Sequence, residues 1–178
     1  MSFDLDLPAL LSALEEHGIA LDADDLPDPD AYEPGDEPEF EYALLNALVE
    51  ALPERGTSVF LSCEEDSVYE GAYRELAESL LALAGDELDA QVGGETIDGE
   101  DGNVEQVLCT IEGAVHEWEF DLDDECLDTA LMEHLAEAID AAGRGRLLRY
   151  YDGGEEMLLI YLPRAVADLL TGQLEFVE

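Results

Sequence analysis

Apolar residues recur along this chain at the spacings of helices and strands, although 30% of its residues are charged. Acidic chains stay unfolded when they cannot bury enough apolar surface to offset the entropy lost on ordering. Here 47% of the 178 residues are hydrophobic, and their stripes continue through the whole sequence. A chain of this length can bury one sizeable core. The sequence therefore predicts a folded protein with a single domain over residues 1–178.

Two segments near the N-terminus have the period of amphipathic helices. The first begins with Asp6 and Pro8, a capping residue and a helix-initiating proline, and ends at Gly18. The second begins near Phe40 and repeats leucine at helical spacing up to Gly56. Residues 22–38, between these helices, are dense in proline and aspartate. We expect them to form an acidic loop within the domain.

From Thr57 onward, short runs with the period of strands alternate with helical segments. Single strands are predicted at residues 57–63 and 87–92, and hairpins at residues 104–122 and 146–162. Residues 93–103 are rich in Gly and Asp, which predicts a loop. Helices are predicted at residues 69–83, 131–139 and 163–170. This order predicts an α+β fold, in which a mostly antiparallel sheet is covered on one side by helices.

Three sets of apolar residues are predicted to lie in the core because each set repeats on one face of its element. The spacing is about four in the two helical sets and two in the strand set. These residues are Leu44, Leu48 and Leu52; Leu131, Leu135 and Ile139; and Leu158, Ile160 and Leu162.

The net charge restricts the possible partners. The chain has 47 acids, six arginines and no lysine, which gives a net charge of −41. Such a surface repels nucleic acid and anionic lipid, so direct binding of DNA, RNA or membrane is excluded. Residues 143–178 are nearly neutral, with six acids and four arginines. The net charge favours a basic partner or a solvent of high salt. Salt adaptation is expected to acidify every exposed surface, so the uneven distribution of acids favours an acidic face directed at a basic protein.

Features of the N-terminus and the cysteines favour a cytoplasmic protein. The first residues have no basic region of the kind that begins a signal peptide, and no apolar run is long enough to span a membrane. The three cysteines, Cys63, Cys109 and Cys126, are odd in number and have no CxxC spacing, so they suggest neither a disulfide framework nor a zinc site. We interpret all three as buried, reduced thiols.

The sequence contains no recognisable catalytic or cofactor-binding motif. Without lysine it lacks a P-loop and a Schiff-base residue, and it has neither GxSxG nor HExxH. The acidic stretch that begins at Asp22 has Pro27 at the position where a calcium-binding EF-hand needs Gly. We therefore predict a protein that is not an enzyme and that binds no metal and no cofactor.

Two acidic segments are the candidates for binding a basic protein partner. The segment from Asp22 to Glu41 has ten acids, no basic residue, and two aromatic residues suited to anchoring a partner. The segment from Asp121 to Glu125 follows a strand, where acids also suit the N-terminus of a helix. The candidate residues are Asp22, Asp24, Asp25, Asp28, Asp30, Tyr32, Glu33, Asp36, Glu37, Glu39, Phe40, Glu41, Asp121, Asp123, Asp124 and Glu125.

The region from the strand with Trp118 through DTALMEHLAEAIDAAGRGRLLRYYDGGEEMLLIYLPRAVADLL resembles bacterial immunity proteins of polymorphic or contact-delivered toxin systems. The resemblance lies in a helix, a strand with arginine and aromatic residues, a glycine turn and a Leu-Ile-Tyr-Leu-Pro strand. It implies a small cytoplasmic α+β protein that binds and blocks one toxin. Together with the charge, it leads to the hypothesis of an inhibitor whose carboxylates occupy a basic, nucleic-acid-type active site.

Two alternatives remain open. The first is a DNA mimic that blocks restriction enzymes or other DNA-binding proteins through the same charge. The second is a salt-adapted cytosolic protein of a halophile, whose acids serve hydration and are not directed at a partner. Abundant Leu and Ala with sparse Thr and Val favour a GC-rich bacterial genome over a halophile.

Overall fold

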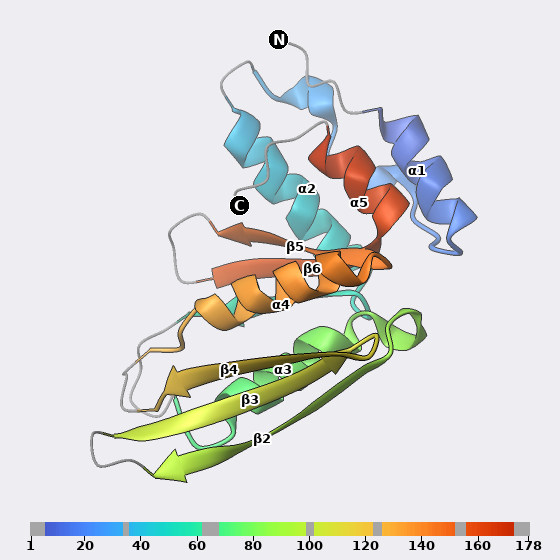
Figure 1. Cartoon of the computed structure of the whole chain (residues 1–178). Helices are drawn as coiled ribbons and strands as arrows, with labels where there is room; N and C mark the ends of the chain where they lie inside the picture. Colours follow the sequence, from blue (N-terminus) through green and yellow to red (C-terminus); the bar gives the residue numbers. More distant parts are fainter. Residues whose placement is uncertain are drawn as a thin grey trace. The chain divides into compact units, whose positions relative to one another are not determined.

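The chain folds into two compact units that each contain helices and strands (Figure 1). Unit 1 comprises residues 1–59 and 145–178, and unit 2 comprises residues 60–144. The computed structural model describes residues 6–33, 36–61, 68–98, 102–122, 126–151 and 156–172. The predicted α+β class with antiparallel sheets is confirmed. The single domain over residues 1–178 stays a prediction.

Unit 1 has a three-stranded sheet in the order β1-β6-β5, in which β5 and β6 form an antiparallel hairpin. Leu148 lies opposite Ile160 in the register of this hairpin. Two short 3-10 turns, η1 and η2, connect the first two helices. The elements are α1 (Leu7–Glu16), η1 (Ala23–Asp25), η2 (Pro29–Ala31), α2 (Glu37–Ala51), β1 (Gly56–Phe60), β5 (Gly145–Tyr151), β6 (Glu156–Pro163) and α5 (Arg164–Thr171).

The core of unit 1 is built from leucines of α1 and α2, the β5-β6 hairpin and α5. The Asp6 carboxylate accepts a hydrogen bond from the Ala9 amide at 3.0 Å and caps the N-terminus of α1, as the sequence predicts. Strand β6 is buried at every position from Met157 to Pro163. Burial of a carboxylate is costly, so the absence of acids from this run is expected and contributes to the low acid count of the C-terminal part of the sequence.

Unit 2 has an antiparallel sheet in the order β2-β3-β4 and two helices. Glu112 and Gly113, which join β3 to β4, both have positive φ, at 48° and 81°. This conformation is that of a tight hairpin turn, which confirms the predicted hairpin. The elements are α3 (Ala72–Ala82), η3 (Gly85–Glu87), β2 (Ala90–Asp98), β3 (Asn103–Ile111), β4 (Ala114–Asp121) and α4 (Ala130–Ala142).

Helices α3 and α4 pack against the same face of this sheet. Tyr73 of α3 stacks on Phe120 with ring centroids 4.4 Å apart. His134 of α4 stacks on Trp118, two residues earlier in β4, with centroids 5.6 Å apart. Because side chains two residues apart point to the same face of a strand, both helices cover one side of the sheet.

The predicted core sets are confirmed. Every member is buried except Leu52, which is half-buried at the end of α2. The loop predicted for residues 93–103 is wrong for residues 93–98, which belong to β2. Gly94 has φ of +137°, and a Cβ there would collide with the carbonyl oxygen of Gln106. This glycine therefore marks a close approach of two strands and not a turn.

The interpretation of the cysteines requires a correction. Cys126 is disulfide-bonded, whereas Cys109 is a buried free thiol on the helix-covered side of β3. Cys63 lies outside the described residues. A disulfide depends on proximity in space, which a sequence without short cysteine spacings does not reveal. The expectation of three reduced thiols is therefore wrong for Cys126.

Candidate functional site

The acidic segment from Asp22 to Glu41 is anchored to the core of unit 1 by its apolar residues. Leu26 is buried between the two 3-10 turns. The half-buried ring of Tyr32 meets the ring of Phe40 edge-on, with centroids 5.2 Å apart. The last five residues of the segment already belong to α2. The segment is thus a packed connection with exposed acids.

Burial removes two residues from the predicted binding set. Phe40 is fully buried and Glu41 is largely buried, so neither side chain is available to a partner. Phe40 precedes Leu44 and Leu48 at a spacing of four, and the helical period that directs these leucines inward also directs Phe40 inward. The expectation that Phe40 anchors a partner is corrected accordingly.

The other described acids of this segment lie at the surface, and they remain candidates. Asp28 accepts a hydrogen bond from the Asp30 amide at 3.0 Å, and Asp36 accepts one from the Glu33 amide at 3.1 Å. These two carboxylates therefore also shape the turns. Asp36 is half-buried, and the side chain of Glu37 lies outside the described residues. The exposed acids are Asp22, Asp24, Asp25, Asp28, Asp30, Glu33 and Glu39.

The second predicted segment is described only in part. Asp121 is exposed at the end of β4, whereas Asp123, Asp124 and Glu125 lie outside the described residues. Closer to α4, the Asp128 carboxylate accepts a hydrogen bond from the amide of Ala130, the first residue of the helix, at 2.9 Å. Asp121 thus belongs to the sheet surface.

A third acidic surface, which sequence reasoning missed, is the side of the unit 2 sheet opposite α3 and α4. We name it the open face. Residues that lie opposite one another in the register share this face. It is formed by Gln91, Gly93, Glu95, Ile97, Val104, Gln106, Leu108, Thr110, Val115, Glu117, Glu119 and Asp121. None of these residues is buried.

The open face combines an aliphatic centre with acidic borders. Leu108 and Val104 lie on the central strand β3, while Glu117, Glu119 and Asp121 follow one another along the edge strand β4. Glu95 lies on the other edge strand, β2. The three strands contain no lysine or arginine.

Two aliphatic side chains on this face are exposed. Val115 is 71% exposed and Ile97 is 41% exposed. The strict alternation of β4, in VHEWEFD, is the sequence signal of a strand with one covered and one open side. It identifies an open face, although it does not reveal that the neighbouring strands add apolar residues to it.

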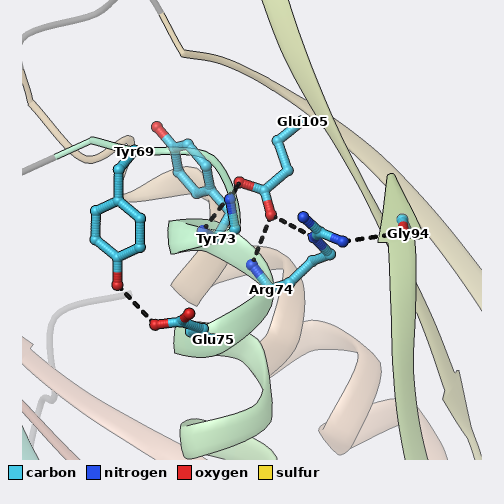
Figure 2. A network of polar contacts seen from close by, with 7 residues as sticks. Tyr69, Tyr73, Arg74, Glu75, Gly94 and Glu105 are labelled. Atoms are coloured by element: carbon cyan, nitrogen blue, oxygen red, sulfur yellow. Dashed lines mark hydrogen bonds and ion pairs between the residues drawn. The ribbon is translucent and has the colours of Figure 1, made fainter. Parts of the chain in front are cut away.

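Unit 2 also contains a buried carboxylate, which holds α3 on the sheet (Figure 2). Glu105 of β3 is fully buried and accepts hydrogen bonds from the amides of Gly71, Tyr73 and Arg74, at 3.1–3.3 Å. It also accepts a bond from Nε of Arg74 at 2.8 Å, and Nη1 of Arg74 donates to the carbonyl oxygen of Gly94 at 3.1 Å. A carboxylate occupied by four donors at a helix N-terminus stabilises the fold and leaves no lone pair directed at a substrate.

Tyr69 lies beside this network at the surface. Its hydroxyl donates to a carboxylate oxygen of Glu75 at 2.7 Å (Figure 2). That hydrogen bond, with burial and the negative charge of Glu75, raises the pKa of Tyr69 above its ordinary value. A phenol held protonated in this way is a poor nucleophile or base near neutral pH.

The histidines do not converge on a reactive group among the described residues. His116 and His134 each stack on Trp118 with ring centroids 5.6 Å apart. Within the part of the chain that the structure describes, no group of three or more His, Cys, Asp or Glu side chains is arranged to hold a metal ion. The described surface does offer exposed carboxylates for binding.

Comparison with protein-family models, curated proteins and solved structures found no match for this chain. None of the described helices has both the length and the apolar character that crossing a membrane requires.

Proposed function

We propose that this chain is an acidic inhibitor that binds a basic protein, of the kind represented by immunity proteins that neutralise a toxin with a nucleic-acid-type active site. The observation that carries the proposal is the open face of unit 2. There, four exposed carboxylates border two exposed and two half-buried aliphatic side chains, on strands that contain no lysine or arginine. A surface of this composition suits a partner that offers both cations and apolar contacts.

The charge density of the open face supports a partner that ordinarily binds nucleic acid. Strand spacings of about 4.8 Å and rises of about 3.3 Å per residue give this face an area of roughly 400 Å². Its four carboxylates then amount to about one charge per 100 Å². Duplex DNA, with a charge per about 1.7 Å on a rod about 20 Å wide, has about the same density.

Measured in the same way, as charge per geometric area, the open face and duplex DNA therefore have similar charge densities. A basic cleft that attracts a phosphate backbone would attract this face by the same long-range force, and the bound inhibitor would exclude nucleic acid from the cleft. A DNA mimic would act by the same chemistry.

One observation favours the alternative of salt adaptation. Acids are abundant in both units, with 22 acids and four arginines in unit 1 and 25 acids and two arginines in unit 2. The low acid count of the C-terminal region follows in part from the burial of β6, so burial and not a directed face accounts for that part of the asymmetry. Salt adaptation does not, however, account for exposed Val115 and Ile97. These side chains favour the inhibitor.

Folding in dilute buffer separates the two functions. We expect the inhibitor to keep its circular dichroism spectrum and a cooperative thermal transition at 10 mM salt, with a modest rise in Tm towards 150 mM as self-repulsion is screened. A salt-adapted protein would be unfolded in dilute buffer and would fold only at molar salt. That second result would overturn the proposed inhibitor function.

Displacement of DNA tests the inhibitor directly. A panel of purified basic nuclease toxin domains, each holding a fluorescent duplex, is titrated with this chain at 150 mM salt. We expect the chain to release the duplex from at least one domain and to block its cleavage of DNA. Bovine serum albumin, a common acidic protein, serves as the control for charge alone. Failure with every domain, or equal displacement by the control, would contradict the proposal.

A further inference from the structure

We infer that the open face is the docking surface, and that its occupant is an amphipathic basic helix of the partner, lying along β3. This inference rests on the proposed function and names the surface and the binding mode. It depends on how the register arranges the apolar and acidic side chains of the three strands.

The register forms an aliphatic strip with acidic borders of unequal strength. Val104 and Leu108 lie on β3, with Val115 at one end of the face and Ile97 at the other. Gln106 interrupts the strip between Val104 and Leu108, and its side-chain amide donates a hydrogen bond to Glu117 at 2.8 Å. The β4 border has three carboxylates, whereas the β2 border has only Glu95. An apolar centre with a polar rim is the usual composition of a protein interface.

Space beside the central strip is available for a partner side chain. Gly93 lies opposite Leu108 in the register, and Glu117 lies on the other side of Leu108. A Cβ at Gly93 would have no heavy atom within 4 Å. The surface next to Leu108 is therefore open on the β2 side, where an apolar side chain of a helix has room to contact it.

The dimensions suit a helix of moderate length. Strands of eight to nine residues extend for about 26–30 Å, which a helix of about 17–20 residues would cover at 1.5 Å per residue. A helix with a leucine stripe and arginines on one flank would bury the aliphatic strip and pair with the β4 carboxylates. The face offers roughly half of the 800 Å² per partner of a standard interface, so we expect a Kd on the order of micromolar.

Charge argues against a second copy of this chain as the occupant. Two open faces brought together would place Glu117 and Glu119 of both copies in one interface without a cation from either face. Like charges at an interface oppose association, and desolvation strengthens this effect. A basic partner removes that repulsion, because its cations neutralise the same carboxylates.

The test uses the full chain and two synthetic 18-residue peptides of equal composition. One peptide has a leucine stripe flanked by arginines at helical spacing, and the other has the same residues scrambled. We expect the amphipathic peptide to bind at least tenfold more tightly than the scrambled peptide in calorimetry at 100 mM salt. Its binding should slow hydrogen exchange in β2, β3 and β4, but not in residues 22–33.

Matched variants remove the same number of charges from two surfaces. The open-face variant replaces Glu95, Glu117 and Glu119 with Gln, and the control variant replaces Asp22, Asp24 and Asp25 with Asn. All six side chains are exposed, so both variants should fold. We expect the open-face variant to raise the Kd of the amphipathic peptide about tenfold and the control variant about twofold or less. The substitution Leu108→Thr, which keeps the charge, should raise the Kd about fivefold.

If both charge variants raise the Kd of the amphipathic peptide equally and Leu108→Thr leaves it unchanged, the peptide binds by net charge. This result would reject the open face as the docking surface, but not the proposed inhibitor function. Sedimentation that reveals a dimer at 150 mM salt, lost in Leu108→Thr, would assign the face to a second copy. The chain could also displace DNA from a toxin domain without binding the amphipathic peptide. This result would reject the helix-docking mode and leave the proposed inhibitor function in place. Failure of both displacement and peptide binding would reject the proposed function as well.

Discussion

The two sheets of this protein differ in how many of their faces are buried. In unit 1, β6 is buried at every position from Met157 to Pro163. In unit 2, β4 alternates, with Phe120 buried against α3 and Glu119 exposed. The run MLLIYLP and the alternating run VHEWEFD encode this difference directly. A strand buried on both faces serves stability, whereas a face left open with aliphatic residues on it is available for binding.

The same comparison explains the distribution of charge. Most described carboxylates lie at exposed positions, with Glu41 and Glu105 as buried exceptions, and none lies in the buried run from Met157 to Pro163. A charge count along the sequence therefore mixes two causes, burial and function, and only the position of each acid on its element separates them. On the open face, the acids lie beside aliphatic residues, and this pairing distinguishes binding from hydration.

The largest difference should follow from one substitution made in both sheets. Ile160→Ala removes a fully buried side chain from the core of unit 1, and we expect it to lower the free energy of unfolding by about 4 kcal/mol. Ile97→Ala makes the same change on the open face, where the side chain is 41% exposed, and should cost about 1 kcal/mol or less. Urea unfolding measures both values. Similar losses would show that the open face is covered.

A second pair of variants compares the two sides of strand β2. Gly94→Ala places a methyl group against the Gln106 carbonyl and requires φ near +137°, so we expect a loss of about 3 kcal/mol. Gly93→Ala adds the same group on the open face, where no heavy atom lies within 4 Å, and should change stability by less than about 1 kcal/mol. Thermal unfolding compares them. A tolerated Gly94→Ala would contradict the close strand approach.

A third comparison concerns carboxylates on the covered and open faces. Glu105→Gln replaces a buried acceptor of four hydrogen bonds with an amide, so we expect a loss of about 2–3 kcal/mol. Glu119→Gln removes an exposed carboxylate and should leave stability within about 0.5 kcal/mol. Guanidinium unfolding gives the two values, and hydrogen exchange should localise the first loss to α3. A neutral Glu105→Gln would argue against the network as the support of α3.

The smallest effect should be limited to alkaline pH. Burial raises the pKa of the Cys109 thiol from 9.0 to about 11, so the folded protein keeps a proton that the unfolded chain releases. The resulting stability is fully present below pH 9 and is lost as the pH rises towards 11. The raised pKa of Tyr69 acts in the same direction. We expect Cys109→Ala to flatten the fall in Tm between pH 9 and 10.5, and an unchanged slope would assign the fall to other groups.

Sequence periodicity predicted the elements well where apolar residues repeat over several turns. The helical set Leu131, Leu135 and Ile139 and the strand set Leu158, Ile160 and Leu162 are buried because the faces on which they repeat meet a core. Period alone failed at Gly94, whose backbone is fitted to a neighbouring strand 12 residues away. Whether a glycine marks a turn or a close contact between strands depends on the partner strand. The local sequence around Gly94 is rich in Gly and Asp, so by itself it predicts a turn.

The binding surface was harder to predict than the fold. Charge pointed to the segment from Asp22 to Glu41, and its acids are indeed mostly exposed, but Phe40 follows the helical period into the core. The open face combines residues from three strands, so it exists only after the register aligns Glu95, Gln106 and Glu119. No single segment of the sequence carries that pattern.

The support of α3 has a consequence for the order in which this protein is synthesised. The carboxylate that caps the helix belongs to Glu105, which accepts a hydrogen bond from the amide of Arg74, 31 residues earlier in the chain. A ribosome releases α3 before it releases β3, so the helix emerges without its cap. An isolated helix of 11 residues is marginal in water. The nascent α3 should therefore remain mostly unfolded until β3 is available, so that the helix and the sheet of unit 2 form together.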